Sequence, residues 1–119
     1  MAAGYVTTHV LDAARGCPAA GLRIELFRLD GAERRLVRTV VTNSDGRTDM
    51  PIIPKGDLVP GIWELVFHAG AYLDAANIPG DDPRFLDQIP IRFGIADPGA
   101  HYHVPLLLSP YSYSTYRGS

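Results

Sequence analysis

Apolar and polar residues alternate along several short stretches of this chain, which is the pattern of strands that bury one face. Leu22–Leu26 and Trp63–His68 alternate strictly, so that Trp63, Leu65 and Phe67 share one face of the second stretch. Both stretches are shorter than an ordinary helix, and both lie among turn-forming residues. They predict strands whose alternate side chains point into a core.

Another alternating set, Ile89–Ile95, contains a proline that bears on its place in a sheet. Pro90 has no backbone N–H to donate to a ladder, and prolines inside strands are found mainly at sheet edges. We therefore expect an edge strand here, whose open side a partner subunit would cover. His68, at the end of its own alternating run, is expected to lie in solvent or to cap a carbonyl.

Two further segments rich in β-branched residues, Val6–Leu11 and Leu36–Val41, also predict strands. The second runs into Asn43-Ser44-Asp45-Gly46, which is typical of a tight hairpin turn with the glycine at positive φ. Arg47 would then open the next strand. Tyr111–Tyr116 alternates aromatic and hydroxyl residues, which predicts an ordered strand near the end of the chain instead of a frayed tail.

Only Ala71–Asn77 has helical character, amounting to a turn or two that ends at Asn77 and Pro79. Ten prolines and twelve glycines are scattered along the chain, and strands recur at about ten-residue spacing. The fold class predicted is all-β, an antiparallel β-sandwich of seven to eight strands, or a barrel, with one short helix. A length of 119 residues without repeat or linker predicts that residues 1–119 form a single domain.

The charge balance argues against several classes of partner. Eleven basic and thirteen acidic residues are spread along the chain without a basic stripe, so no nucleic acid partner is expected. Apolar runs such as Val104–Leu108 are far shorter than the ~20 residues that span a bilayer, and Met1–Tyr5 does not resemble an export signal. Cys17, expected in a loop, is the only cysteine, which suits a reducing compartment. We expect a cytoplasmic protein without a membrane partner.

Histidines are the main candidates for chemistry. His101 and His103 are two residues apart, so their imidazoles face the same way, about 7 Å apart in an extended chain. Tyr102 and Val104 take the opposite side, which is the apolar one, so the imidazoles should face outward. From spacing alone, two interpretations stay open: plain surface histidines, or a metal site with His9 as a third ligand. No acidic residue or cysteine accompanies the pair.

Single polar residues are less informative. Arg47 after a turn is most simply a solvated charge. Ser109 lacks the Gly-x-Ser-x-Gly surroundings of a nucleophile elbow, so a serine-hydrolase triad is not expected. No glycine-rich phosphate loop is present either.

Six segments spread along the chain carry a resemblance to a known family. They are Thr7–Asp12, Gly16–Ala19, Thr42–Arg47, Phe93–Ile95, His101–Pro110 and the closing Tyr116-Arg117-Gly118-Ser119. Together they resemble the transthyretin-like 5-hydroxyisourate hydrolases of urate breakdown, a family whose signature is that closing tetrapeptide. Transthyretin itself shares the run from Leu107 to Thr115, but it continues into a longer apolar tail and lacks the histidine and arginine set.

The resemblance implies an eight-stranded sandwich with one short helix, assembled as a homotetramer (dimer of dimers) with active sites in a channel between the dimers. The resemblance implies that four residues are catalytic, namely His9, Arg47, His103 and Ser119. It implies that three residues bind substrate, namely Tyr116, Arg117 and Arg47. The implied reaction is opening of the six-membered ring of 5-hydroxyisourate by water, which yields 2-oxo-4-hydroxy-4-carboxy-5-ureidoimidazoline (OHCU). No cofactor and no metal are implied. The alternative is a transthyretin-like small-molecule binding protein without turnover.

This residue set suits hydrolysis at an acyl carbon, which needs a base for water, donors for the oxyanion and a proton for the departing nitrogen. Histidine, with an ordinary pKa near ~6.5, serves as base or acid at neutral pH. We expect His9 and His103 to share these tasks in an order that the sequence leaves open. Arg47 suits a flat, electron-rich substrate, and Ser119 would orient water or substrate. His101 matches no catalytic position and is expected either to support the catalytic residues from behind or to be peripheral.

Overall fold

The computed structural model describes residues 3–119, so Met1 and Ala2 of the segment compared with export signals lie outside it. The elements in this range are β1 (Tyr5–Thr7), β2 (Val10–Asp12), β3 (Cys17–Pro18), β4 (Arg23–Asp30), β5 (Glu33–Val41), β6 (Gly61–His68), α1 (Ala69–Ala75), β7 (Gln88–Ile95), β8 (His101–His103), β9 (Leu106–Ser109) and β10 (Ser112–Thr115). Within residues 3–119, no helix is long and apolar enough to cross a bilayer.

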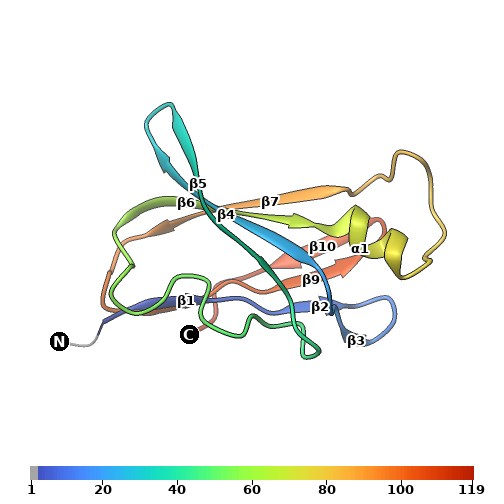
Figure 1. The fold of residues 1–119 in the computed structure, drawn as a ribbon, viewed down its shortest axis with the longest axis horizontal. Coiled ribbons are helices and arrows are strands. Elements are labelled where there is room, and N and C mark those ends of the chain that lie inside the picture. Colours follow the sequence, from blue (N-terminus) through green and yellow to red (C-terminus); the bar gives the residue numbers. More distant parts are fainter. Residues whose placement is uncertain (1–2) are drawn as a thin grey trace.

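The strands form two layers (Figure 1). In one layer β5, β4, β6 and β7 pair in that order, all antiparallel. The other layer has the order β10-β9-β2-β3, and β1 paired with β8 extends it at one end. Because β1 and β2 follow a common line, as do β8 and β9, the strands of residues 3–119 count as eight when these pairs are joined. The predicted all-β sandwich with one short helix is confirmed.

Two strand pairs depart from the expected antiparallel arrangement. β1 with β8 and β2 with β9 run parallel, because the chain crosses through the other layer before it returns in the same direction. The expected continuous strand Val6–Leu11 is also interrupted, at Thr8 and His9. The break lies beside Pro105, which has no N–H to offer to the ladder.

The core lies between the layers and contains the apolar faces predicted from alternation. It includes Trp63, Leu65 and Phe67 of β6, Leu22, Ile24 and Leu26 around β4, and Tyr102, Val104, Leu106 and Leu108 around β8 and β9. Helix α1 starts two residues earlier than predicted and buries Tyr72 and Leu73. β7, which contains Pro90, is an edge strand as predicted.

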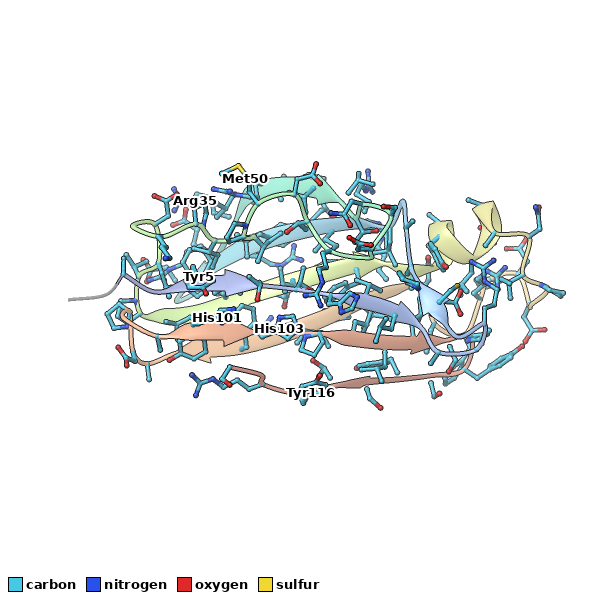
Figure 2. All side chains as sticks on the ribbon, turned by 90° about the horizontal axis from the view of Figure 1, so that it is seen from below. Tyr5, Arg35, Met50, His101, His103 and Tyr116 are labelled. Atoms are coloured by element: carbon cyan, nitrogen blue, oxygen red, sulfur yellow. The ribbon has the colours of Figure 1, made fainter. Side chains whose placement is uncertain are left out.

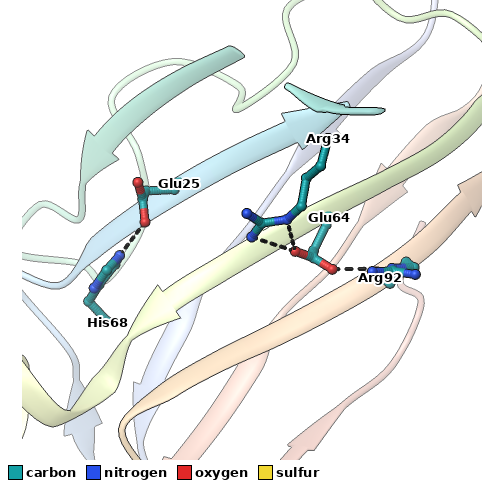
Figure 3. Close-up of polar contacts among 5 residues, drawn as sticks. All are labelled: Glu25, Arg34, Glu64, His68 and Arg92. Atoms are coloured by element: carbon teal, nitrogen blue, oxygen red, sulfur yellow. Dashed lines mark hydrogen bonds and ion pairs between the residues drawn. The ribbon is translucent and has the colours of Figure 1, made fainter. Parts of the chain in front are cut away.

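The outer face of β6 is buried as well, which contradicts the solvent position expected for His68. Only 7% of His68 is exposed, and its Nε2 lies 2.5 Å from Oε1 of Glu25. Glu64 accepts hydrogen bonds from Arg34 and Arg92 (Figure 3). The difference arises because β6 is an inner strand between β4 and β7, so long side chains from these strands and from β5, the next strand beyond β4, fold over its polar groups.

A buried carboxylate, paired with a half-exposed arginine, joins the turn after β2 to helix α1. Asp12 is 2% exposed and accepts hydrogen bonds from Nε of Arg15 and from the hydroxyl of Tyr72, each at 2.8 Å. Burial by itself would raise the pKa of the Asp12 carboxyl, but these hydrogen bonds outweigh burial and lower it. Cys17, expected in a loop, instead lies in the short strand β3, which pairs with β2 at this position.

Candidate functional site

Three of the predicted site residues, His9, Arg47 and His103, lie where the two parallel strands are interrupted. His9, between β1 and β2, pairs through its backbone with Arg47 in an isolated antiparallel bridge. His103, the last residue of β8, pairs in the same way with Gly118. The N–H of Leu106 donates to the carbonyl of His9 at 2.9 Å, which closes the break on its other side. The fold therefore brings two imidazole-bearing segments, the arginine turn and the chain end to one place.

A compact turn holds Arg47 beside His9. The side-chain oxygen of Asn43 accepts the backbone N–H groups of Asp45 and Arg47 at 2.9 and 3.2 Å. Gly46 has the predicted positive φ of 75°, and its carbonyl accepts the N–H of Val10 at 2.8 Å. A Cβ at Gly46 would lie 2.3 Å from the carbonyl oxygen of Val10, so only glycine fits. The expectation that Arg47 opens the next strand is wrong: the turn is pressed against β2, and Arg47 forms only the isolated bridge with His9.

The orientation of His9 is set by the same turn. Nε2 of His9 lies 2.8 Å from the carbonyl oxygen of Asp45. A carbonyl only accepts, so Nε2 carries the proton and the neutral ring keeps Nδ1 unprotonated. His9 is half-buried and Arg47 is exposed. The pair thus offers a basic nitrogen and a permanent positive charge next to each other.

His103 faces outward from the core, as predicted, together with His101 (Figure 2). The hydroxyl of Thr7 lies 2.8 Å from Nδ1 of His103 and 2.7 Å from Nε2 of His101. Burial, with smaller contributions from the charges of Arg47, His101 and His9, lowers the pKa of the His103 imidazole below its ordinary value. His103 is therefore neutral at physiological pH and free to accept a proton.

The chain end packs directly against His103. The N–H of Gly118 donates to the His103 carbonyl at 2.8 Å, and the N–H of His103 donates back at 3.2 Å. A Cβ at Gly118 would lie 3.1 Å from both Cβ and Cδ2 of the histidine, so backbone and ring are in close contact. Ser119 follows in an exposed position.

Tyr116 and Arg117 are not gathered with the imidazoles. The strand predicted to reach Tyr116 ends at Thr115, and Tyr116 is 58% exposed. The guanidinium of Arg117 lies 4.1 Å from the centre of the Tyr102 ring, which belongs to the core side of β8. Both residues border a groove at the edge of the sandwich, together with Phe93 of β7.

Two contacts at the site involve residues absent from the sequence prediction. Thr7 bridges the two imidazoles, and the ring of Tyr5 stacks on His101 at 4.2 Å with an interplanar angle of 8°. The period-two spacing of Tyr5, Thr7 and His9 on one strand face was the signal that could have identified them. Among residues 3–119, no three His, Cys, Asp or Glu side chains come together in a way that could hold a metal ion.

The sequence matches a known family over nearly its whole length. The model of the HIUase/Transthyretin family matches residues 6–118. The protein named 5-hydroxyisourate hydrolase 2 of Rhizobium meliloti (strain 1021) is 60% identical over 116 residues, which cover 98% of this chain and 97% of that relative.

Solved structures agree with this match. The structure of Klebsiella pneumoniae 5-hydroxyisourate hydrolase superposes with a TM-score of 0.79 at 30% identity, covering 98% of this chain and 94% of that one. The crystal structure of (S)-allantoin synthase superposes with a TM-score of 0.94 at 48% identity. That match covers 99% of this chain but 44% of the other, so this chain spans less than half of that protein. By its sequence and its fold, the chain belongs to the HIUase/Transthyretin family.

Proposed function

We propose that this protein is a 5-hydroxyisourate hydrolase, which uses water to open the six-membered ring of its substrate and releases OHCU. The observation that supports this most directly is the meeting of His9, Arg47, His103 and Gly118 at one break in the sheet. Relatives that carry the name of this activity, at up to 60% identity, support it independently.

The proposed reaction needs one proton to travel from water to the substrate. The water oxygen bonds to the ring acyl carbon, the carbon–nitrogen bond breaks, and the departing nitrogen takes up the proton. His9 and His103 share these transfers. Two properties support this assignment: Nδ1 of His9 is unprotonated in the neutral ring, and the lowered pKa of His103 keeps that ring neutral at pH 7.

Arg47 is proposed to stabilise the negative charge that develops on the carbonyl oxygen. Its guanidinium is always charged and planar, and it stays exposed beside His9, where a flat substrate has access to it. Ser119, which follows the residue paired with His103, is proposed to orient the water or the substrate. Tyr116 and Arg117 are proposed to bind substrate from the groove at the strand edge.

The assembly proposed is a homotetramer, a dimer of dimers in which the open side of each site is covered by another subunit. β7 and β10 are edge strands with free backbone groups, and all four residues of β10 are exposed. We also propose that residues 1–119 form a single domain, since one apolar cluster joins both layers. The single free thiol of Cys17 supports a cytoplasmic location.

The test is an absorbance assay with freshly prepared 5-hydroxyisourate, followed in the ultraviolet with and without protein and corrected for spontaneous decay. We expect decay well above the spontaneous rate. Because the pKa of His103 is lowered, the acid limb of kcat/KM should lie below the value near ~6.5 of a free imidazole. Saturable binding without acceleration would refute the hydrolase and support the transthyretin-like binding protein.

A further inference from the structure

The hydroxyl of Thr7 lies between two imidazoles, 2.7 Å from Nε2 of His101 and 2.8 Å from Nδ1 of His103. A threonine hydroxyl has a single proton, so it donates in at most one of these two hydrogen bonds. At least one ring must therefore donate to Thr7. The protonation states of the two histidines are linked through this oxygen.

We propose that Thr7 and His101 form a proton relay with His103, in which His101 takes up the positive charge when His103 accepts a proton during hydrolysis. The inference rests on the proposed function and deepens it. His101 and Thr7 act through His103, which makes them positioning residues for the reaction and not groups that touch substrate.

The relay begins with His103 carrying its proton on Nδ1 and donating it to Thr7, which donates its own proton to Nε2 of His101. Nε2 of His103 is then unprotonated and accepts a proton from the attacking water. The Nδ1 proton passes to Thr7, and the hydroxyl proton passes to His101. His103 is neutral again with its proton on Nε2, and His101 is an imidazolium. When Nε2 gives its proton to the departing nitrogen, both shifts reverse and no charge is left over.

Burial, and after it the charges of Arg47, His101 and His9, disfavour a proton held on the His103 ring. Arg47 and His9 approach from the turn and from the break in the sheet, and both contribute to the electrostatics of His103. Gly118 packs against the ring, with Ser119 next to it. A transfer that moves positive charge away from the permanent charge of Arg47 is therefore favourable.

His101 lies against an aromatic ring. Its ring centre lies 6.3 Å from that of His103, and it stacks on Tyr5 at 4.2 Å, so an imidazolium there meets an aromatic face. A charged group on this side is Lys55, whose Nζ lies 5.2 Å from the centre of the same tyrosine ring. The positive charge of Lys55 acts against the transfer, whereas the aromatic ring of Tyr5, which contacts both Lys55 and His101, favours it.

The test compares three variants with the wild-type protein. Thr7→Val keeps the shape of the side chain but removes the hydroxyl, Thr7→Ser restores the hydroxyl, and His101→Phe keeps an aromatic ring on Tyr5 without a titratable group. We expect kcat to fall about 100-fold in Thr7→Val and in His101→Phe, within the range for loss of acid–base help, and to stay within a few-fold in Thr7→Ser. Thr39→Val, an exposed threonine on the edge strand β5, is the matched control and should leave kcat unchanged.

A second readout does not depend on turnover. Long-range proton–nitrogen NMR of the histidine rings should show His101 and His103 titrating as a coupled pair in the wild-type protein and separately in Thr7→Val. Wild-type kcat and an unaltered pH profile in both Thr7→Val and His101→Phe would overturn the relay and leave the proposed function standing. Independent titration of the two rings in the wild-type protein would also overturn it. A wild-type protein without turnover would refute the proposed function, whatever the NMR result.

Discussion

Gly46 offers a sharp test of how the turn before Arg47 builds the site. In Gly46→Ala, the new Cβ would lie 2.3 Å from the carbonyl oxygen of Val10, whereas nonbonded carbon contacts sit near 3.5–4.0 Å. The turn must therefore move away from β2 by on the order of 1 Å. The left-handed backbone at φ 75° adds roughly 1 kcal/mol for any residue with a Cβ.

The displacement has two consequences of predictable size. It lengthens the hydrogen bond from Val10 to Gly46, and a buried hydrogen bond left unmade costs about 1–3 kcal/mol. With the backbone term, we expect a loss of about 2–4 kcal/mol in the free energy of unfolding. Arg47 is the next residue and moves with the turn. A misplacement of about 1 Å at a catalytic group is expected to lower turnover roughly 100-fold.

Urea unfolding and the ultraviolet assay measure the two effects separately. Gly31→Ala is the control, since Gly31 has a φ of 60° and nothing within 4 Å of an added Cβ. It should lose about 1 kcal/mol of stability from the backbone alone and keep full activity. If Gly46→Ala matches Gly31→Ala in both stability and turnover, the turn is not pressed against β2, and the argument that it positions Arg47 fails.

Three further outcomes are expected. Replacing His9, Arg47 or His103 by alanine should lower turnover several hundredfold while the assembly stays intact in gel filtration, and a variant with near-wild-type rates would remove that residue from the catalytic set. Asp12→Asn should reduce the free energy of unfolding by roughly 1–2 kcal/mol at pH 7, because it removes the charge of a buried carboxylate that accepts hydrogen bonds from Tyr72 and from the half-exposed Arg15, where solvent screens the attraction. The folded pKa of this carboxyl is depressed, so its stabilisation is present above the unfolded value near 3.8 and is lost as the pH falls through the folded pKa; the difference between variant and wild type should therefore shrink at acid pH in urea titrations. Residues added after Ser119 should abolish most of the activity, because the chain end packs beside His103, and a fully active tagged protein would contradict this.

Alternation of apolar and polar residues predicted correctly which face of each strand is buried when the opposite face lies in solvent. Trp63, Leu65 and Phe67 are in the core as their spacing indicates. The same pattern was wrong for His68 on the other face of β6. Alternation reports which residues face the core, but it does not report that β6 is an inner strand whose outer face is covered by charged side chains from other strands of the same sheet.

The outward direction of His101 and His103 followed from strand geometry, and the positive φ at Gly46 from turn chemistry. The hydroxyl between the imidazoles was not predictable in the same way. Thr7 lies 94 positions from His101 in the chain, and the two meet because β1 and β8 pair in parallel after the chain has crossed the other layer. The side of the sheet that Arg117 occupies was decided by the packing of its guanidinium on Tyr102.

The sequence by itself determined the local states: which residues form strands, which side of each faces the core, where glycine must turn the chain, and which family the chain resembles. The first three depend on backbone sterics and on side-chain periodicity within about ten neighbouring residues, whereas the resemblance depends on motifs spread along the chain. Only the tertiary structure decided the parallel pairing of β1 with β8, the break beside Pro105, and the contact of His9 and His103 with Arg47 and Gly118. Those pairings join residues far apart in the chain, and they form because the two apolar layers are buried together only in this register.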